Sequence, residues 1–162
     1  MTYQTYENLS NLPSGSDFNQ LSKAIKIATL AHDGQFDKGG MPYILHPLHV
    51  MNQVREYGEE AMIIAVLHDV VEDTCTTFES LQEAGFSNRV LNAITYLTHR
   101  KEVSYDGYIN IISLCFDKII PRIKMEDIRH NSDIMRLKGL TEKDFKRIER
   151  YQKAFTLLKG VL

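Results

Sequence analysis

Residues 68–73 (HDVVED) concentrate side chains that can bind a metal ion and move protons. An imidazole and a carboxylate are adjacent at His68 and Asp69, and Glu72 and Asp73 follow four residues after each of them, a spacing that shares a helix face. Burying four such groups beside an apolar run costs free energy unless they serve a purpose. The pattern indicates a metal site at a helix end, and the alternative is a solvated helix end that caps the next element.

Two distant residues can complete such a site. His46 offers a second imidazole, and Asp127 offers a second carboxylate with Asn131 one helical turn further on. Mixed nitrogen and oxygen ligands suit manganese, iron, zinc or magnesium, and they favour manganese or iron over calcium. An ion with free coordination positions makes a bound water far more acidic, which is the chemistry of hydrolysis.

Helices must position these residues, because apolar side chains recur at helical spacing along the chain and no alternating strand pattern with hairpin turns occurs. Ser16 or Asp17 is a good N-cap for the first helix, and the apolar segment 59–71 is expected to be the central one. We predict an all-α fold, a single compact helical bundle with a central metal site. The predicted helices span residues 16–31, 47–58, 59–71, 76–85, 87–97, 105–115, 121–135 and 141–159.

Local signals support several of these boundaries. Thr76 and Glu79 have the spacing of a capping box, as do Thr141 and Asp144. Ser104 is the expected cap of the helix that follows it. The basic residues of the last helix are interpreted as a solvated face, because they are too sparse for a nucleic-acid site; they are Lys143, Lys146, Arg147, Arg150 and Lys153.

Length and charge limit the class of protein. The 162 residues fit one domain, which we assign to residues 17–162, preceded by a polar segment at residues 1–16. Acidic residues outnumber basic ones, 21 to 19, which argues against nucleic acid as a partner. The start of the chain lacks the pattern of a signal peptide and the apolar run 61–67 is too short to cross a bilayer, so we expect a cytoplasmic protein with no membrane partner and free thiols at Cys75 and Cys115.

Four segments resemble a known family. The pattern of His46, the His68-Asp69 pair and Asp127 is similar to the H…HD…D pattern of the HD-domain phosphohydrolases. The likeness is closest to the RelA/SpoT-type (p)ppGpp hydrolase domain, and it spans about residues 22–135. It rests on residues 31–35 (AHDGQ), 40–47 (GMPYILHP), 67–74 (LHDVVEDT) and 124–131 (KMEDIRHN).

The resemblance implies an HD-domain fold and a metal-dependent phosphohydrolase. It implies one manganese ion held by His46, His68, Asp69 and Asp127. The implied reaction removes the 3′-diphosphate from guanosine tetra- or pentaphosphate, the alarmone nucleotides. The family's synthetase domain has no room in this chain, so a small hydrolase-only form is expected.

The resemblance also implies roles around the metal. Glu72 and Asp73 would be the acid/base pair that orients and activates the attacking water. Lys38, Asn131 and Lys124 would contact the nucleotide, a small-molecule substrate.

Two departures fall where the family grips its nucleotide. Asp37-Lys38 replaces the usual Arg-Lys pair of the loop, and Ile128 replaces the Arg that usually follows the last ligand, with Arg129 displaced by one residue. A carboxylate at position 37 would repel phosphate, which motivates a second hypothesis: hydrolysis of another nucleotide or of the 2′-phosphate of NADPH. A third hypothesis is a catalytically silent nucleotide-binding module.

Three other histidines have open roles. His32 could be a further metal ligand or a hydrogen-bonded structural residue. His49 could orient His46 as a partner behind the metal or lie at the surface. His99, next to Arg100 and Lys101, could bind phosphate or belong to a solvated helix end.

Overall fold

Helices form the architecture of residues 20–162, which are the part of the chain that the computed structural model describes. The predicted segment 1–16 and the predicted N-caps Ser16 and Asp17 lie outside these residues. No strand occurs within residues 20–162, where the extended pairing is limited to a single bridge between Phe36 and Pro42. The helices are α1 (Gln20–Ala31), α2 (Leu45–Gln53), η2 (Arg55–Tyr57), α3 (Glu59–Leu67), α4 (Val70–Asp73), α5 (Phe78–Glu83), α6 (Asn88–Leu97), α7 (Tyr105–Ser113), α8 (Ile119–Asn131), η3 (Ile134–Arg136) and α9 (Glu142–Lys159).

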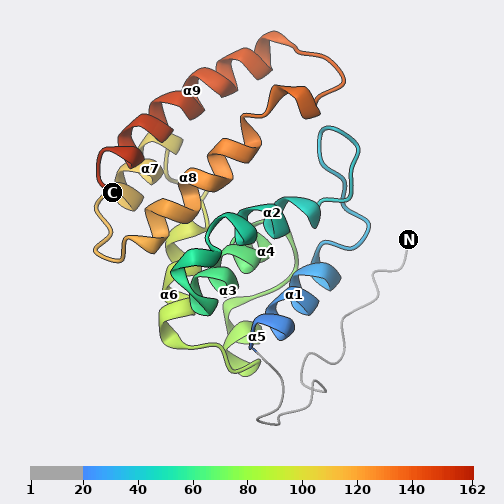
Figure 1. Cartoon of the computed structure of the whole chain (residues 1–162), viewed down its shortest axis with the longest axis vertical. Coiled ribbons are helices and arrows are strands. Elements are labelled where there is room, and N and C mark those ends of the chain that lie inside the picture. Colours follow the sequence, from blue (N-terminus) through green and yellow to red (C-terminus); the bar gives the residue numbers. More distant parts are fainter. Residues whose placement is uncertain (1–19) are drawn as a thin grey trace.

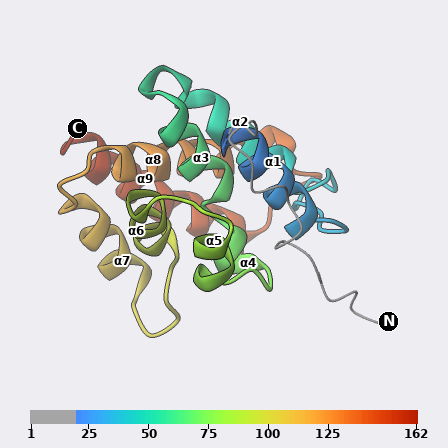
Figure 2. The ribbon, with the colours of Figure 1, turned by 90° about the horizontal axis from the view of Figure 1, so that it is seen from below.

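Helix α3 lies at the centre of the bundle, as its all-round apolar sequence predicts. It packs against α1, α2, α6 and α8, and its residues from Ile63 to Leu67 are all buried. Helices α8 and α9 lie side by side, with α8 between α9 and the α1–α3 layer (Figure 1). On another side of α3 lies α6, which also contacts α5 and α7, and α7 packs against α8 and α9 (Figure 2).

The predicted helix 59–71 is interrupted. Helix α3 ends at Leu67, and α4 begins at Val70 after the pair His68-Asp69. The Asp69–Asp73 pair keeps the predicted shared face, because Asp73 N donates to Asp69 O over 2.9 Å and the Tyr43 hydroxyl contacts both carboxylates. In an unbroken helix, adjacent side chains point about 100° apart, whereas the break lets the His68 and Asp69 side chains approach each other.

Two other predicted boundaries are wrong by local geometry. Thr77, rather than Thr76, caps α5: its hydroxyl accepts from Ser80 N, and the Ser80 hydroxyl accepts from Thr77 N. The predicted helix 121–135 stops as α8 at Asn131, and a separate turn η3 follows. The capping box of α9 at Thr141 and Asp144 and the cap of α7 at Ser104 are confirmed.

The segment between α1 and α2 is a loop that folds back on itself. Asp37 N donates to Met41 O, and Gly34 and Gly40 have φ of +75° and +86°, which suits glycine. The loop ends where Pro47 enters the first turn of α2. Among the helices within residues 20–162, none has both the length and the apolar character that crossing a membrane requires.

Candidate metal centre

The three most buried polar side chains of the predicted site come from three packed helices. His46 lies in the first turn of α2, His68 caps the end of α3, and Asp127 lies in α8, four residues before its end. All three are at most 4% exposed. Because α2 packs on both α3 and α8, residues 81 positions apart in sequence meet at one point.

The ligand atoms of His46, His68 and Asp127 lie within 4.8 Å of one another. Asp127 Oδ1 is 3.1 Å from His46 Nε2 and 3.9 Å from His68 Nε2. Asp69 Oδ2 adds a fourth atom, 3.4 Å from His46 Nε2 and 3.0 Å from His68 Nε2. Ligands that each lie about 2.1 Å from one ion are separated by roughly 3–4 Å, so the four atoms fit a single ion.

The orientation of both imidazoles turns hydrogen-bond acceptors toward the centre. His68 Nδ1 donates to Ala65 O over 2.7 Å, and His46 Nδ1 is bonded to His130 Nδ1 over 2.7 Å. Neither His46 Nε2 nor His68 Nε2 has a well-aligned hydrogen-bond partner, although both are buried. Nitrogen lone pairs facing carboxylate oxygens repel each other unless a cation or a proton lies between them. The donor set therefore fits a divalent metal ion.

The pKa values follow from the same crowding. Burial alone lowers the pKa of His68, but the carboxylates of Asp69 and Asp127 outweigh it and raise that pKa to about 10. Burial raises the pKa of Asp127, but Lys124 and the two histidines hold it well below its ordinary value. In the protein alone, protons thus compensate the charge that a metal ion would compensate.

Lys124 and Asn131 hold the two oxygens of Asp127. The Lys124 ammonium lies 2.7 Å from Oδ2 and over the ring of Tyr108, and Asn131 Nδ2 donates to Oδ1. Lys124 was predicted to contact substrate, and the structure places its ammonium on the carboxylate of Asp127 instead of on a cavity wall.

The predicted acid/base residues Glu72 and Asp73 flank the centre on α4. Glu72 Oε2 accepts from the backbone N of His99 over 2.7 Å. The Tyr43 hydroxyl donates to Asp69 Oδ2 over 2.7 Å and lies 3.2 Å from Asp73 Oδ2, so Asp73 and Asp69 share a donor. Burial and the nearby carboxylates raise the pKa values of Glu72 and Asp73.

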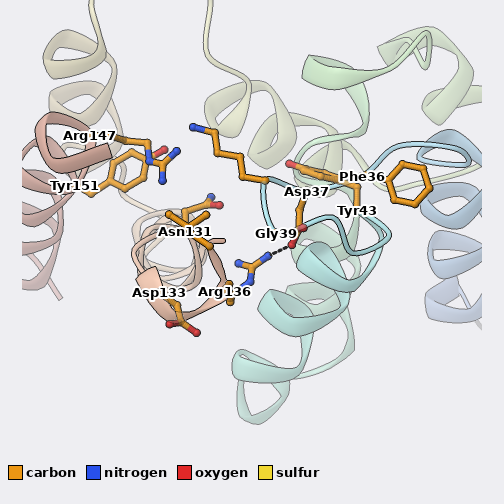
Figure 3. A pocket seen from close by; sticks show the side chains of 11 residues that line it. Phe36, Asp37, Gly39, Tyr43, Asn131, Asp133, Arg136, Arg147 and Tyr151 are labelled. Carbon is orange, nitrogen blue, oxygen red and sulfur yellow. Dashed lines mark hydrogen bonds and ion pairs between the residues drawn. The ribbon is translucent and has the colours of Figure 1, made fainter. Parts of the chain in front are cut away.

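Figure 3 shows the residues around a cavity of about 220 Å³. It adjoins the centre through Tyr43 and Asn131, which line it and bond to Asp69 and Asp127. Its walls come from the loop before α2, the end of α8 with η3, and one face of α9, and they include Lys38, Tyr43, Asn131, Arg136, Arg147 and Tyr151. Lys38 extends from the loop toward α9: its side chain is 67% exposed, and its ammonium lies 4.0 Å from Asp144 Oδ1.

The last helix contributes more than the solvated face that its sequence suggested. Arg147 is only 14% exposed, and its Nη2 lies 3.2 Å from Asp144 while its Nε has no hydrogen-bond partner within residues 20–162. Tyr151 lies one turn further on the same wall (Figure 3). The four-residue spacing of an arginine and a tyrosine was the available signal, since such residues share a helix face.

The two departures from the family pattern have structural explanations. Asp37 is ion-paired with Arg136 and accepts from Met41 N, so its charge is compensated within the cavity wall. Ile128 is buried in the core at 2% exposure. Arg129 does not take over at the cavity, because its side chain is 58% exposed and pairs with Glu126.

The remaining histidines take separate places. His32 is buried, its Nδ1 is bonded to Gln35 Oε1 over 2.8 Å, and its Nε2 has no hydrogen-bond partner within residues 20–162, so both predicted roles stay predictions. His49 stacks on His130 with ring centroids 4.2 Å apart, so it lies beside the histidine that bonds to His46 Nδ1. His99 Nε2 is bonded to Val103 O, and its backbone N orients Glu72.

Comparison with known proteins identifies relatives of one kind. No protein-family model matches the chain. A guanosine-3′,5′-bis(diphosphate) 3′-pyrophosphohydrolase of Spiroplasma citri is 38% identical over 126 residues, which cover 69% of this chain and 16% of the relative. A protein of the same name from Aquifex aeolicus is 36% identical over 99 residues, 60% of this chain and 14% of the relative.

A solved structure extends the likeness to the fold. It is described as a metazoan orthologue of SpoT that hydrolyses ppGpp, with 21% sequence identity and a TM-score of 0.75 over 91% of this chain and 90% of that chain. The predicted all-α HD-domain bundle is thus confirmed. The chain spans only 14% and 16% of the two curated relatives named above. By sequence and fold together, the chain belongs to the RelA/SpoT-type family of HD hydrolase domains.

Proposed function

We propose that this chain is a metal-dependent phosphohydrolase that uses one manganese ion to remove the 3′-diphosphate from guanosine tetra- or pentaphosphate. One observation carries the proposal: the buried Nε2 atoms of two imidazoles lie within 3–4 Å of two carboxylates. Neither nitrogen has a well-aligned hydrogen-bond partner within residues 20–162. The substrate class comes from the names of the sequence relatives. The domain itself would comprise residues 17–162.

His46, His68, Asp69 and Asp127 would hold the ion. When bound, a divalent ion offsets the charge of the phosphoryl oxygens and lowers the pKa of a coordinated water. Manganese is chosen because two imidazoles and two carboxylates form a mixed ligand set of intermediate hardness. Lys124 supports the site through Asp127, since its ammonium orients that carboxylate over 2.7 Å.

Glu72 and Asp73 would serve as the acid/base pair. Glu72 is held by His99 N, which leaves its other oxygen to accept the proton of the attacking water. Its raised pKa makes it a stronger base than an ordinary glutamate. Asp73 would orient the same water, next to the Tyr43 hydroxyl that also binds Asp69.

The adjoining cavity would receive the rest of the nucleotide. Lys38 and Arg147 provide positive charge on either side of Asp144 Oδ1, 4.0 Å and 3.2 Å from it, and Asn131 offers an amide that also bonds to Asp127. Tyr151 presents an aromatic ring on the α9 wall, a surface suited to stacking with a base (Figure 3).

A manganese-dependent substrate panel on the full chain tests the proposal. Guanosine tetraphosphate should release diphosphate, and elemental analysis should find about one ion per chain. Tight nucleotide binding without turnover under any divalent metal would instead identify a silent binding module. Absence of diphosphate release together with turnover of another phosphate ester would remove the alarmone assignment and keep the hydrolase.

A second candidate substrate is another nucleotide or the 2′-phosphate of NADPH. Asp37 favours it, because a carboxylate lies in a cavity wall where the family usually carries an arginine. Its pairing with Arg136 lowers the repulsion of phosphate without adding an attractive charge. NADPH therefore belongs in the same substrate panel.

A further inference from the structure

A chain of side-chain contacts runs behind His46, on the side away from the metal centre. His46 Nδ1 lies 2.7 Å from His130 Nδ1, and Arg136 Nη1 lies 2.8 Å from the same His130 nitrogen. A guanidinium can only donate, so His130 Nδ1 must accept. His46 Nδ1 must then be the donor, which directs His46 Nε2 to the centre with its lone pair free for a metal.

Arg136 is itself held at several points. Its Nη1 also donates to the backbone O of His130 over 3.0 Å, and its Nη2 is ion-paired with Asp37 Oδ2. The other oxygen of Asp37 accepts from Met41 N over 2.9 Å, inside the loop. Gly39 lies so close to the Arg136 carbonyl that a Cβ at this position would collide with it. The loop and η3 are thus closely packed (Figure 3).

His130 has little freedom to leave this arrangement. Its ring stacks between those of His46 and His49, with centroids 4.9 Å and 4.2 Å away and interplanar angles of 30° and 25°. The stacking sets the plane of the ring and Arg136 sets which nitrogen accepts.

We propose that Arg136 is a positioning residue: through His130 it fixes the tautomer and orientation of His46 as a metal ligand, and Asp37 fixes Arg136. This inference rests on the proposed metal-dependent function. Asp37 acts here as the counter-ion of Arg136 instead of as a contact for substrate. The loop that forms one cavity wall and the metal centre therefore behave as one coupled unit.

Manganese affinity of the full chain, measured by electron paramagnetic resonance, tests the inference without any substrate. Arg136→Ala should weaken binding by about 10–100-fold, as for other residues that orient a metal-bound histidine. Arg136→Lys should recover part of the affinity, because it keeps a donor and a charge. Arg55→Ala is the matched control, since Arg55 is an exposed arginine in the other short turn, η2, and its affinity should equal that of the wild type.

The ¹⁵N spectrum of the histidine rings gives a signature that a merely structural role would not change. In the wild-type chain, His130 should have its proton on Nε2 and none on Nδ1. In Arg136→Ala, His130 Nδ1 should become partly protonated, because the reversed pair, with His130 Nδ1 donating to His46 Nδ1, is then no longer opposed by the guanidinium. A His130 spectrum that is identical in both proteins would overturn the inference.

A milder variant covers the case in which Arg136→Ala does not fold. Asp37→Asn keeps Arg136 and His130 and should weaken manganese binding by only a few-fold. In the Arg136→Lys background, Asp37→Asn should weaken manganese binding less than it does in the wild-type chain, because both substitutions act on His46 through His130. Wild-type manganese affinity in the folded Arg136 variants overturns the inference alone, whereas a wild-type chain that binds no divalent ion overturns the proposed function as well.

Discussion

The two histidines of the candidate metal centre are oriented in different ways. His68 Nδ1 bonds to Ala65 O, three residues earlier at the end of the same helix. His46 Nδ1 bonds to His130, 84 residues further along the chain, which is held in turn by Arg136 and Asp37. The first orientation results from helix geometry alone, and the second requires four segments to be packed correctly: α2, α8, η3 and the loop before α2.

This difference predicts where the site tolerates change. No side-chain substitution can remove the acceptor of His68, because that acceptor is a backbone carbonyl. The support of His46 consists of side chains that can be substituted one at a time. Substitutions around His46 can therefore change the metal affinity, whereas the orientation of His68 cannot be changed through its hydrogen-bond partner.

The largest effect is expected when either metal-binding histidine is removed. His68→Ala and His46→Ala should each reduce metal content from about one ion per chain to near zero and abolish turnover, because three remaining ligands cannot replace the missing imidazole. Elemental analysis and a diphosphate-release assay measure both quantities. His99→Ala is the control for loss of a histidine, because its ring is bonded to Val103 O, and the variant should keep its metal. Normal metal content in His46→Ala would show that the two histidines do not share an ion.

The second prediction concerns the acid/base residue next to His68. Glu72→Gln should keep the metal and lower kcat by about 10²–10⁴-fold, because the amide cannot take a proton. Glu79→Gln, an exposed glutamate one short helix later, is the matched control and should leave kcat unchanged. A kcat close to the wild type in Glu72→Gln would remove the assigned role from this residue.

The third prediction concerns the cavity next to His46. Arg147→Ala should raise KM by about tenfold with a smaller change in kcat, because the lost charge binds a part of the substrate away from the reacting bond. Lys146→Ala changes a neighbouring exposed cation of the same helix and serves as the control. A lower kcat with an unchanged KM would move Arg147 from substrate binding to the chemical step.

The smallest expected effect is on stability and depends on pH. Burial raises the pKa of Asp37, but Met41 N and Arg136 outweigh it and lower that pKa below the ordinary value of 3.8. A lowered pKa in the folded state stabilises the protein above pH 3.8, and this stabilisation is lost as the pH falls through the folded-state pKa.

Asp37→Asn should accordingly lower the free energy of unfolding by about 1 kcal/mol at pH 7. The difference from the wild type should shrink as the pH falls below 3.8. Urea unfolding of both proteins at several pH values measures it. A difference that stays constant with pH would mean that the Asp37 charge does not stabilise the fold.

Much of the fold could be predicted from sequence because the signals are local. The capping box at Thr141 and the apolar periodicity of α6 each lie within one helix. The break between α3 and α4 could not be predicted from sequence. His68 and Asp69 both keep helical backbone angles, and only packing decides that the helix is interrupted. The end of α8 at Asn131 had no glycine or proline to announce it.

The site divides in the same way. The His68-Asp69 pair with Glu72 is visible as a short motif, so its chemistry could be inferred from the residues alone. The pairing of Asp37 with Arg136 joins residues 99 positions apart and leaves no pattern in either segment. The burial of Arg147 was missed because its neighbours on α9 are exposed and charged.

The buried lysine behind Asp127 has a consequence for the charge of the loaded centre. A divalent ion among the carboxylates of Asp69, Asp127, Glu72 and Asp73 would leave a surplus of about two negative charges, which would repel an anionic molecule. The Lys124 ammonium, 2.7 Å from Asp127 and shielded from solvent, reduces that surplus to about one. A proton on Glu72 or Asp73, whose pKa values are raised, would remove the rest. The lysine would thus bring the loaded centre close to neutrality and allow a phosphate ester to approach the ion.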